Sequence, residues 1–420
     1  MYDWANSAFI TTIISAVFPP YFSAIATAGD AMSKADATAK LSLTTTIALV
    51  IGAIIAPVFG AIGDHLPLKK KFLGGFMLIG AASACAMYAL EPGSWMLAAV
   101  LFGIGNVAAT GSFVFYDSLL PHIASPDEVD RVSTAGYALG YVGGGILLAI
   151  QLAAISKPEW FGLADSDTAV RVAFVSVGLW WAVFAIPLFK RVPEPPVLLR
   201  TNAPKGFAVV GRSVAGLGNT LKELKRYRQA FLFMLAFLIY NDGIGTIIRM
   251  AAIYGEEIGI TTSVLIGAIL LTQFVGIPFA FLFGALAGKI GAKTSIYIGL
   301  AVYCCISVLG YFMTENWHFL ALALLVGMVQ GGTQALSRSI FASMIPKTKS
   351  AEFFGLFAVF ERFAGVLGPL VFTIVVTAVG SSRIAIFAII GFFVLGGWLL
   401  RGVDVAEGQR IAREAEREAL

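Results

Sequence analysis

The sequence predicts an all-α membrane protein of about twelve transmembrane helices, arranged in two pseudo-symmetric six-helix bundles. Apolar stretches of roughly 20 residues recur along the whole 420-residue chain, and each is long enough to cross about 30 Å of hydrocarbon. Hydrophobic residues make up 58% of the sequence and charged residues 13%, against about 25% charged residues in soluble domains. A soluble fold has no interior large enough for that apolar surface, so we expect the bilayer to be the solvent.

The hydrophobic pattern divides the chain into two sets of six spans. The expected spans, in chain order, are 4–28, 42–62, 72–90, 95–116, 132–155, 170–190, 229–254, 262–286, 294–313, 317–341, 354–379 and 382–400. Residues 191–228 form the longest polar interruption and begin with Pro193, Glu194, Pro195 and Pro196, which predicts a linker between bundles at 1–190 and 229–400. The charged, helix-prone tail at 401–420 is expected to extend into solvent.

Within the linker, apolar residues recur at alternating steps of three and four from Phe207 to Leu224, opposite several basic residues. This spacing is typical of an amphipathic helix. Such a helix lies on the inner leaflet or packs on the cytoplasmic ends of the bundles, and the pattern alone does not choose between the two.

Basic residues predict the orientation of the chain. If the N-terminus is cytoplasmic, 22 of the 29 Lys and Arg residues fall in inside segments and five in outside segments. No basic segment precedes the first apolar run, and Pro19, Pro20 and Tyr21 stand where a signal cleavage site needs small residues. We therefore expect a multi-pass protein of the inner (plasma) membrane, with both termini cytoplasmic and the first run kept as a helix.

The sequence contains no pattern typical of a catalytic or metal site. Its three cysteines, Cys85, Cys304 and Cys305, lie in apolar runs, and its three histidines are scattered in loops or helix ends. No pair of nucleophile and base is evident. We expect no enzyme activity, no cofactor, no metal and, since the net charge of +4 serves orientation, no nucleic-acid partner.

The connection after the second span has a distinctive glycine and charge pattern. Asp64 follows Gly60 by four residues and precedes a basic run that includes Lys69 and Lys70. One interpretation of this pattern is a tight turn between two spans, with basic residues placed by the positive-inside rule. The pattern also resembles the signature loop of the major facilitator superfamily, in which the aspartate caps a neighbouring helix. That resemblance implies that Gly60, Asp64, Lys69 and Lys70 form part of a cytoplasmic gate.

Ionisable residues within the spans are candidates for function, because each costs roughly 3 kcal/mol or more unless it faces a cavity or a partner. Asp242 and Arg249 are seven residues apart, which places them on one helical face. Asp117 and Arg338 lie at helix ends, where an interfacial ion pair is the expected role. The candidate solute or proton pathway comprises Asp3, Trp4, Asn6, Tyr240, Asn241, Asp242, Arg249 and Glu361.

Glycines cluster in the fifth and eleventh expected spans. The fifth carries glycines from Gly136 to Gly145, and the eleventh carries Gly365 and Gly368 before Pro369. Such residues let helices pack closely and bend. The fifth-span run is similar to the glycine motif of antiporters, but Tyr141 stands where that motif has proline, so close packing is the favoured interpretation.

Four runs carry a resemblance that spans nearly the whole chain: YDWANSAF at 2–9, the segment 113–145, LIYNDGIGTII at 238–248, and GGTQALSRS with SAEFFGLF within 331–357. They resemble the vacuole-effluxer-like family, the autophagy-related amino-acid effluxers of fungal vacuoles and their bacterial relatives. The resemblance implies a major facilitator fold and export of neutral amino acids. Family members usually carry a polar segment before the first run, whereas Met1 directly precedes Tyr2, which predicts a displaced start codon or a shortened first helix.

The resulting hypothesis is a monomeric secondary transporter that moves a small-molecule solute across the lipid bilayer by alternating access, with an aspartate or Glu361 as carrier of a coupling proton. A peptide, a sugar or another metabolite is the alternative solute. A membrane scaffold or sensor that keeps the carrier fold without transport is the rival class, and it predicts no solute flux.

Overall fold

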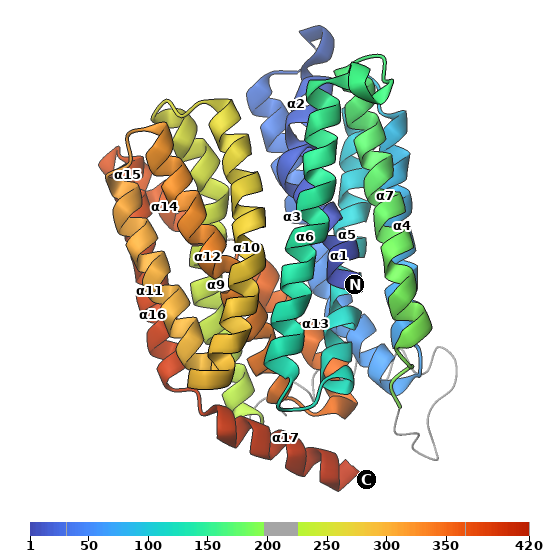
Figure 1. Cartoon of the computed structure of the whole chain (residues 1–420), viewed down its shortest axis with the longest axis vertical. Helices are drawn as coiled ribbons and strands as arrows, with labels where there is room; N and C mark the ends of the chain where they lie inside the picture. The colour runs from blue at the N-terminus through green and yellow to red at the C-terminus, as the bar shows by residue number, and fades with distance from the viewer. Residues whose placement is uncertain (31, 197–225, 366, 420) are drawn as a thin grey trace. The chain divides into compact units, whose positions relative to one another are not determined.

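The structure, a computed structural model, describes residues 1–30, 32–196, 226–365 and 367–419, and these are almost entirely helical (Figure 1). The amphipathic helix expected at 207–224 lies outside the described residues. The chain divides into two compact units. The N-terminal unit comprises Met1–Ala56, Pro67–Tyr116 and Leu139–Pro195, and the C-terminal unit comprises Pro57–Leu66, Asp117–Ala138 and the described part of Pro196–Leu420.

The helices of the first half are α1 (Tyr2–Ala8), the π-helix η1 (Phe9–Ala16), α2 (Phe18–Thr27), α3 (Lys34–His65), α4 (Lys69–Ala86), α5 (Trp95–Ile123), α6 (Val129–Ser156) and α7 (Ser166–Arg191), with 3₁₀ turns η2 (Ala28–Asp30), η3 (Met87–Ala89) and η4 (Pro158–Phe161). Three of them, α3, α5 and α6, each contribute one end to the C-terminal unit.

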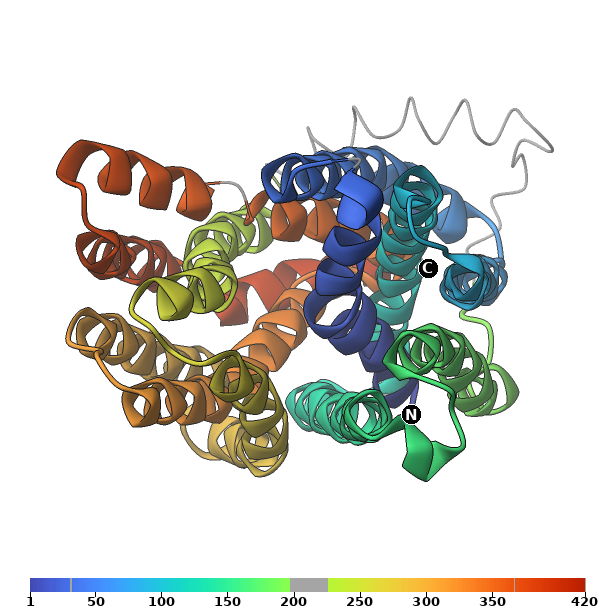
Figure 2. The ribbon, with the colours of Figure 1, turned by 90° about the horizontal axis from the view of Figure 1, so that it is seen from above.

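The helices of the second half are α9 (Arg228–Glu257), α10 (Thr262–Ile290), α11 (Ala292–Tyr311), α12 (Asn316–Ser343), the 3₁₀ turn η5 (Lys347–Lys349), α13 (Ser350–Phe363), α14 (Leu367–Val379), α15 (Ser382–Ala388), α16 (Ile390–Arg401) and α17 (Val405–Ala419). Within each unit, most helices are seen nearly end-on in Figure 2. The core of the C-terminal unit includes Leu120, Ala124 and Val129 beside Phe233 and Phe341.

In the described residues, eleven helices are long and apolar enough to cross a membrane, and a twelfth span results if α1, η1 and α2 count as one. Within this span, the segments Tyr2–Ala16 and Phe18–Thr27 are bent by 43° relative to each other. The bend has a local cause, because Pro19 and Pro20 in the first turn of α2 have no N–H to continue the ladder from η1. The prediction of about twelve apolar helices is confirmed.

Besides the first span, two expected spans are not continuous helices, and one of them, 382–400, divides into α15 and α16. Residues 354–379 are interrupted, because α13 ends at Phe363 and α14 begins at Leu367. Gly365, Gly368 and Pro369 flank the interruption, and residues of these types weaken or bend a helix. The glycines thus accompany an interruption of the helix between α13 and α14.

The prediction that the tail extends into solvent is wrong for its described part. α17 lies across the end of the C-terminal unit (Figure 1) and packs on α9 and α12. Its apolar face carries Val405, Ile411, Ala412 and Ala415 at helical spacing, and Ala412 is only 3% exposed. A helix with one apolar stripe gains free energy by burying it, and the charge count alone concealed that stripe.

Candidate functional site

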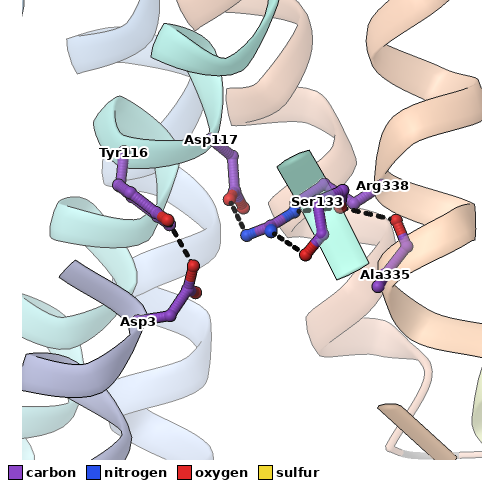
Figure 3. Close-up of polar contacts among 6 residues, drawn as sticks. All are labelled: Asp3, Tyr116, Asp117, Ser133, Ala335 and Arg338. Carbon is purple, nitrogen blue, oxygen red and sulfur yellow. Dashed lines mark hydrogen bonds and ion pairs between the residues drawn. The ribbon is translucent and has the colours of Figure 1, made fainter. Parts of the chain in front are cut away.

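The candidate residues of the first helix lie in the N-terminal unit. Asp3 is buried and accepts a hydrogen bond from the Tyr116 hydroxyl of α5 (Figure 3). Trp4 stacks on Trp180 of α7 at 5.9 Å between ring centroids, and the Trp180 indole N–H donates to the Trp4 carbonyl over 3.1 Å. These contacts fix α1 against α5 and α7.

Two polar atoms of this group are buried without a hydrogen-bond partner: the Asn6 side-chain nitrogen Nδ2 and the Trp4 indole nitrogen Nε1. Leaving a buried donor unpaired costs about 1–3 kcal/mol, so such donors are candidates for binding a ligand. Helix α6 packs closely against α1 at Trp4. A Cβ at Gly143 would lie 2.4 Å from the Trp4 carbonyl oxygen, which explains the glycines of the fifth expected span.

Sequence reasoning missed Gln151 of α6. Its Oε1 accepts from the Thr12 hydroxyl over 2.7 Å, and its Nε2 donates to the Ala173 carbonyl and the Ser176 hydroxyl. It therefore ties the π-helix η1 to α7. The available signal was a single amide within an otherwise apolar stretch.

In the C-terminal unit, α9 carries the second candidate group. The Tyr240 hydroxyl lies 2.6 Å from the Ser337 hydroxyl, and Asn241 Oδ1 accepts from Gln334 Nε2 over 3.5 Å. Both partners belong to α12. These contacts orient the turn of α9 that also holds Asp242.

Asp242 and Arg249 both contact the interruption between α13 and α14. Asp242 is fully buried, and its Oδ2 accepts from the Gly368 backbone N–H over 2.9 Å, while Oδ1 has no hydrogen-bond partner. Arg249 is exposed, and its Nη2 donates to the Ala364 carbonyl over 3.4 Å. The two side chains share a face of α9, as their spacing predicts, but each binds backbone rather than the other.

Glu361 and its neighbour Arg362 lie on α13. Glu361 is exposed, and in the described residues no hydrogen bond or ion pair joins it to Asp242 or Arg249. Arg362 Nε is buried without a hydrogen-bond partner. The structure therefore does not bring Glu361 into the Asp242 group.

The gating residues Gly60 and Asp64 lie in the C-terminal unit. The Asp64 carboxylate accepts from the backbone N–H groups of Ala351 at 3.1 Å and Glu352 at 2.7 Å, which belong to the first turn of α13. Those N–H groups have no partner within their own helix, and the helix dipole favours an anion there. A Cβ at Gly60 would lie 2.2 Å from the Ala351 carbonyl oxygen, so this approach needs glycine.

Lys69 and Lys70 lie in the N-terminal unit. The Lys70 backbone N–H donates to Glu194 over 3.1 Å, and its ammonium donates to the Phe189 carbonyl over 3.0 Å and to the Val192 carbonyl. Lys70 thus stabilises the C-terminal end of α7, where carbonyl groups lack helical partners. Lys69 is buried, with 3% of its surface exposed.

Arg338 of α12 joins the C-terminal unit's segments from α5 and α6 (Figure 3). Its Nη1 lies 3.0 Å from Asp117, its Nε donates to the Ser133 hydroxyl over 3.0 Å, and its Nη2 donates to the Ser133 carbonyl over 3.1 Å. The Ser133 hydroxyl in turn donates to the Ala335 carbonyl over 2.7 Å. The expected ion pair is present, and Ser133 is a partner that the sequence did not reveal.

Comparisons with known proteins agree with this architecture. A family profile described as vacuole effluxer Atg22 like matches residues 1–413. An uncharacterized MFS-type transporter of Bacillus subtilis, YxiO, is 37% identical over 94% of this chain and 91% of its own length. Autophagy-related protein 22 of Coccidioides immitis is 24% identical over 88% of this chain and 73% of its own length.

Among solved structures, the proton:xylose symporter XylE of the major facilitator superfamily superposes with a TM-score of 0.71 at 13% identity, covering 99% of this chain and 96% of the symporter. At that identity the likeness concerns the fold. The fold is therefore the major facilitator fold, as the sequence predicts.

Proposed function

Because the chain belongs to the vacuole effluxer Atg22-like family of major facilitator transporters, we propose that it carries a small solute across the inner membrane by alternating access, and that the solute is a neutral amino acid moved outward. Family and fold are those of transporters, not of enzymes. We take the working form to be a monomer in the bilayer, with a proton as the coupling ion.

The carboxylate of Asp64 on the first turn of α13 is the observation that carries the transport mechanism. Two backbone N–H groups donate to one buried carboxylate, and hydrogen bonds to a charged group contribute about 1.5–3 kcal/mol each. Hydrogen bonds of that strength favour the arrangement in which the end of α3 contacts the start of α13, and they can still break during a transport cycle. We assign Gly60 and Asp64 to a gate that closes and reopens in each cycle, with Lys69 and Lys70 fixing the following helix.

The contacts of Arg338 support a second gating contact in the same unit. Arg338 is 6% exposed, and its guanidinium holds Asp117 and Ser133, which lie at the end of α5 and the start of α6. Truncating one partner of a buried, hydrogen-bonded ion pair leaves a charge without compensation. Opening must therefore separate this pair as a unit rather than one bond at a time.

The chemistry of α9 supports a zwitterionic solute. Asp242 offers an oxygen without a partner, Arg249 is an exposed cation on the same face, and Tyr240 and Asn241 add a ring and an amide. An ammonium group is suited to the carboxylate and a carboxylate to the guanidinium. In the N-terminal unit, Asp3, Trp4 and Asn6 are the corresponding candidates for solute contact.

Solute flux from proteoliposomes tests the function. Purified protein should release preloaded neutral amino acids faster than sugars or organic acids, and Arg249→Gln should lower amino-acid flux at least tenfold. Arg383→Gln is the matched control, because Arg383 also donates to a backbone carbonyl over 3.4 Å but lies on α15. Folded protein that moves none of these solutes would instead support a scaffold or sensor.

Cysteine labelling tests the proposed orientation. With both termini in the cytoplasm, a cysteine replacing the exposed Lys34 or Lys157 should react with an impermeant reagent added to intact cells. A cysteine replacing Lys71, also exposed, should react only after the membrane is opened. The reverse pattern would overturn the orientation.

A further inference from the structure

The interruption between α13 and α14 leaves two open helix ends beside α9. A helix that stops exposes carbonyl groups, and one that starts exposes N–H groups, and within a membrane protein these need partners from the protein. Asp242 supplies an acceptor to Gly368 at the start of α14, and Arg249 supplies a donor to Ala364 at the end of α13. About two turns of α9 therefore supply partners to both ends of one broken span.

The charges match the ends that they contact. An anion is favourable at a helix N-terminus and a cation at a C-terminus, which is the arrangement of Asp242 and Arg249. Glycines make the contact close. A Cβ at Gly368 would lie 1.8 Å from the Thr246 hydroxyl, and a Cβ at Gly245 or Gly365 would lie 2.7 or 3.2 Å from the Arg249 guanidinium.

The Asp242 carboxylate is only half satisfied by this arrangement. It is fully buried, Oδ2 accepts one hydrogen bond, and Oδ1 has no hydrogen-bond partner. Burying a charge with an unsatisfied oxygen is costly, and a proton on Oδ1 would remove that charge while Oδ2 stays next to the Gly368 N–H. The Oδ1 atom can thus accept a proton without first breaking the hydrogen bond at Oδ2.

Few other charges act on Asp242. On its own helix Arg249 interacts with it electrostatically. Among the helices packed on α9, α14 has no ionisable residue and α16 has only Arg401 at its end. The charged residues of α13 are Glu352, Glu361 and Arg362, and those of α17 begin at Glu407; in the described residues no hydrogen bond or ion pair joins any of them to Asp242. Arg338 of α12 is held by Asp117 and Ser133, and in the described residues no hydrogen bond or ion pair joins the Asp242 carboxylate to α10 or α11.

We propose that Asp242 is the binding site of the coupling proton, and that a proton on its Oδ1 releases the first turn of α14 from α9. This inference rests on the proposed transport function and selects Asp242 over Asp3, which a tyrosine hydroxyl already holds, and over the exposed Glu361. A proton from water on one side adds to Oδ1 and gives a neutral acid. The start of α14 then loses its counter-charge, and α14 moves until the proton leaves to the other side and the cap forms again.

Asp242→Asn in proteoliposomes tests the proposal. The amide still accepts from Gly368 through its oxygen but binds no proton at neutral pH. Solute exchange between loaded vesicles and medium at equal pH needs no net proton movement and should remain measurable at saturating solute even where loss of the carboxylate weakens solute binding, whereas accumulation driven by a pH gradient should fall to about the equilibrium ratio. Glu257→Gln, which changes an exposed carboxylate on the same helix, should keep both activities.

Gradient-driven accumulation that persists in Asp242→Asn would overturn the proposal, and so would wild-type accumulation driven by a sodium gradient but not by a pH gradient. Wild-type protein without exchange of any solute would instead remove the transport function on which the proposal rests. If the variant does not fold, hydrogen exchange of the wild type decides. Corrected for intrinsic rates, amide protection in the first turn of α14 should fall about tenfold on acidification, and unchanged protection would contradict the proposal.

Discussion

Two helix starts in the C-terminal unit receive an aspartate from another helix, and they differ in how completely the carboxylate is used. At the start of α13, Asp64 accepts from two backbone N–H groups, one at each oxygen. At the start of α14, Asp242 accepts from one, and its Oδ1 has no hydrogen-bond partner. The two carboxylates therefore differ in geometry: both oxygens of Asp64 accept a backbone N–H, whereas Asp242 keeps one buried oxygen that accepts none.

An exposed helix start provides the reference for both. Asp165 precedes α7, and its Oδ1 accepts from the Thr168 backbone N–H over 2.7 Å. An aspartate carboxylate therefore accepts from a helix start in solvent, where it belongs to the same chain segment, and in nearly buried and fully buried places, where it comes from another helix. The energetic weight of a helix cap should follow that order, because water competes with the bond least where the group is buried.

The largest effect is expected at the fully buried start. Gly368→Ala places a Cβ 1.8 Å from the Thr246 hydroxyl, so α14 must move away from α9. Overpacking of this kind costs about 1–3 kcal/mol and should lower the melting temperature of the purified protein by several degrees. Gly391→Ala on α16, where a Cβ would meet nothing within 4 Å, should melt at or above the wild-type temperature. Equal melting of both variants would mean that α14 does not depend on this contact.

An intermediate effect is expected at the start of α13. Asp64→Asn keeps one acceptor but loses the charge, so turnover should fall about tenfold, equivalent to roughly 1.4 kcal/mol, while solute affinity changes less than about threefold. Lys71→Gln changes an exposed charge in the same connection and should leave both quantities unchanged. Turnover and affinity measured on the same vesicles check this, and lost affinity with normal turnover would show that Asp64 contacts solute instead.

The smallest effect is expected at the exposed start. Hydrogen bonds from Thr168 hold the pKa of the Asp165 carboxyl below its usual range. A lowered folded-state pKa means that the contribution to stability is present above the unfolded value of about 3.9 and is lost as the pH falls through the folded value. At pH 7, Asp165→Ala should therefore increase amide exchange in the first turn of α7, and the difference from wild type should shrink as the pH falls through the lowered folded-state pKa of Asp165. A difference that persists in acid would show that the carboxylate charge is not the cause.

Much of the fold follows from local patterns in the sequence. Span lengths and the basic residues between them predict the helices, because the bilayer imposes both. The signature loop predicts that Asp64 caps a helix, and the structure identifies that helix as α13. Asp117 and Arg338 were expected at helix ends and are paired there.

What the sequence leaves open depends on contacts between residues far apart in the chain. The spacing of Asp242 and Arg249 predicts a shared face but not that the face meets a helix break more than 100 residues later. Gly365 and Pro369 predict a bend, whereas the break also requires that α9 bind both open ends. The docking of α17 depends on complementary apolar surface, and Gln151 depends on the π-helical shift of Thr12, neither of which a charge or hydropathy count records.

The docking of α17 has a practical consequence for experiments on this protein. Its Glu416 accepts from the Lys347 backbone N–H over 2.8 Å, and its Gln409 donates to the Ser343 hydroxyl over 3.1 Å. The helix is therefore hydrogen-bonded to the connection between α12 and α13. A purification tag or fluorescent fusion attached after α17 would disturb these contacts and, through the connection, the helix start that Asp64 caps. The turn η4, where Trp160 is 76% exposed, is a better place for a reporter, because it lies in the other unit and its side chains are not part of the core.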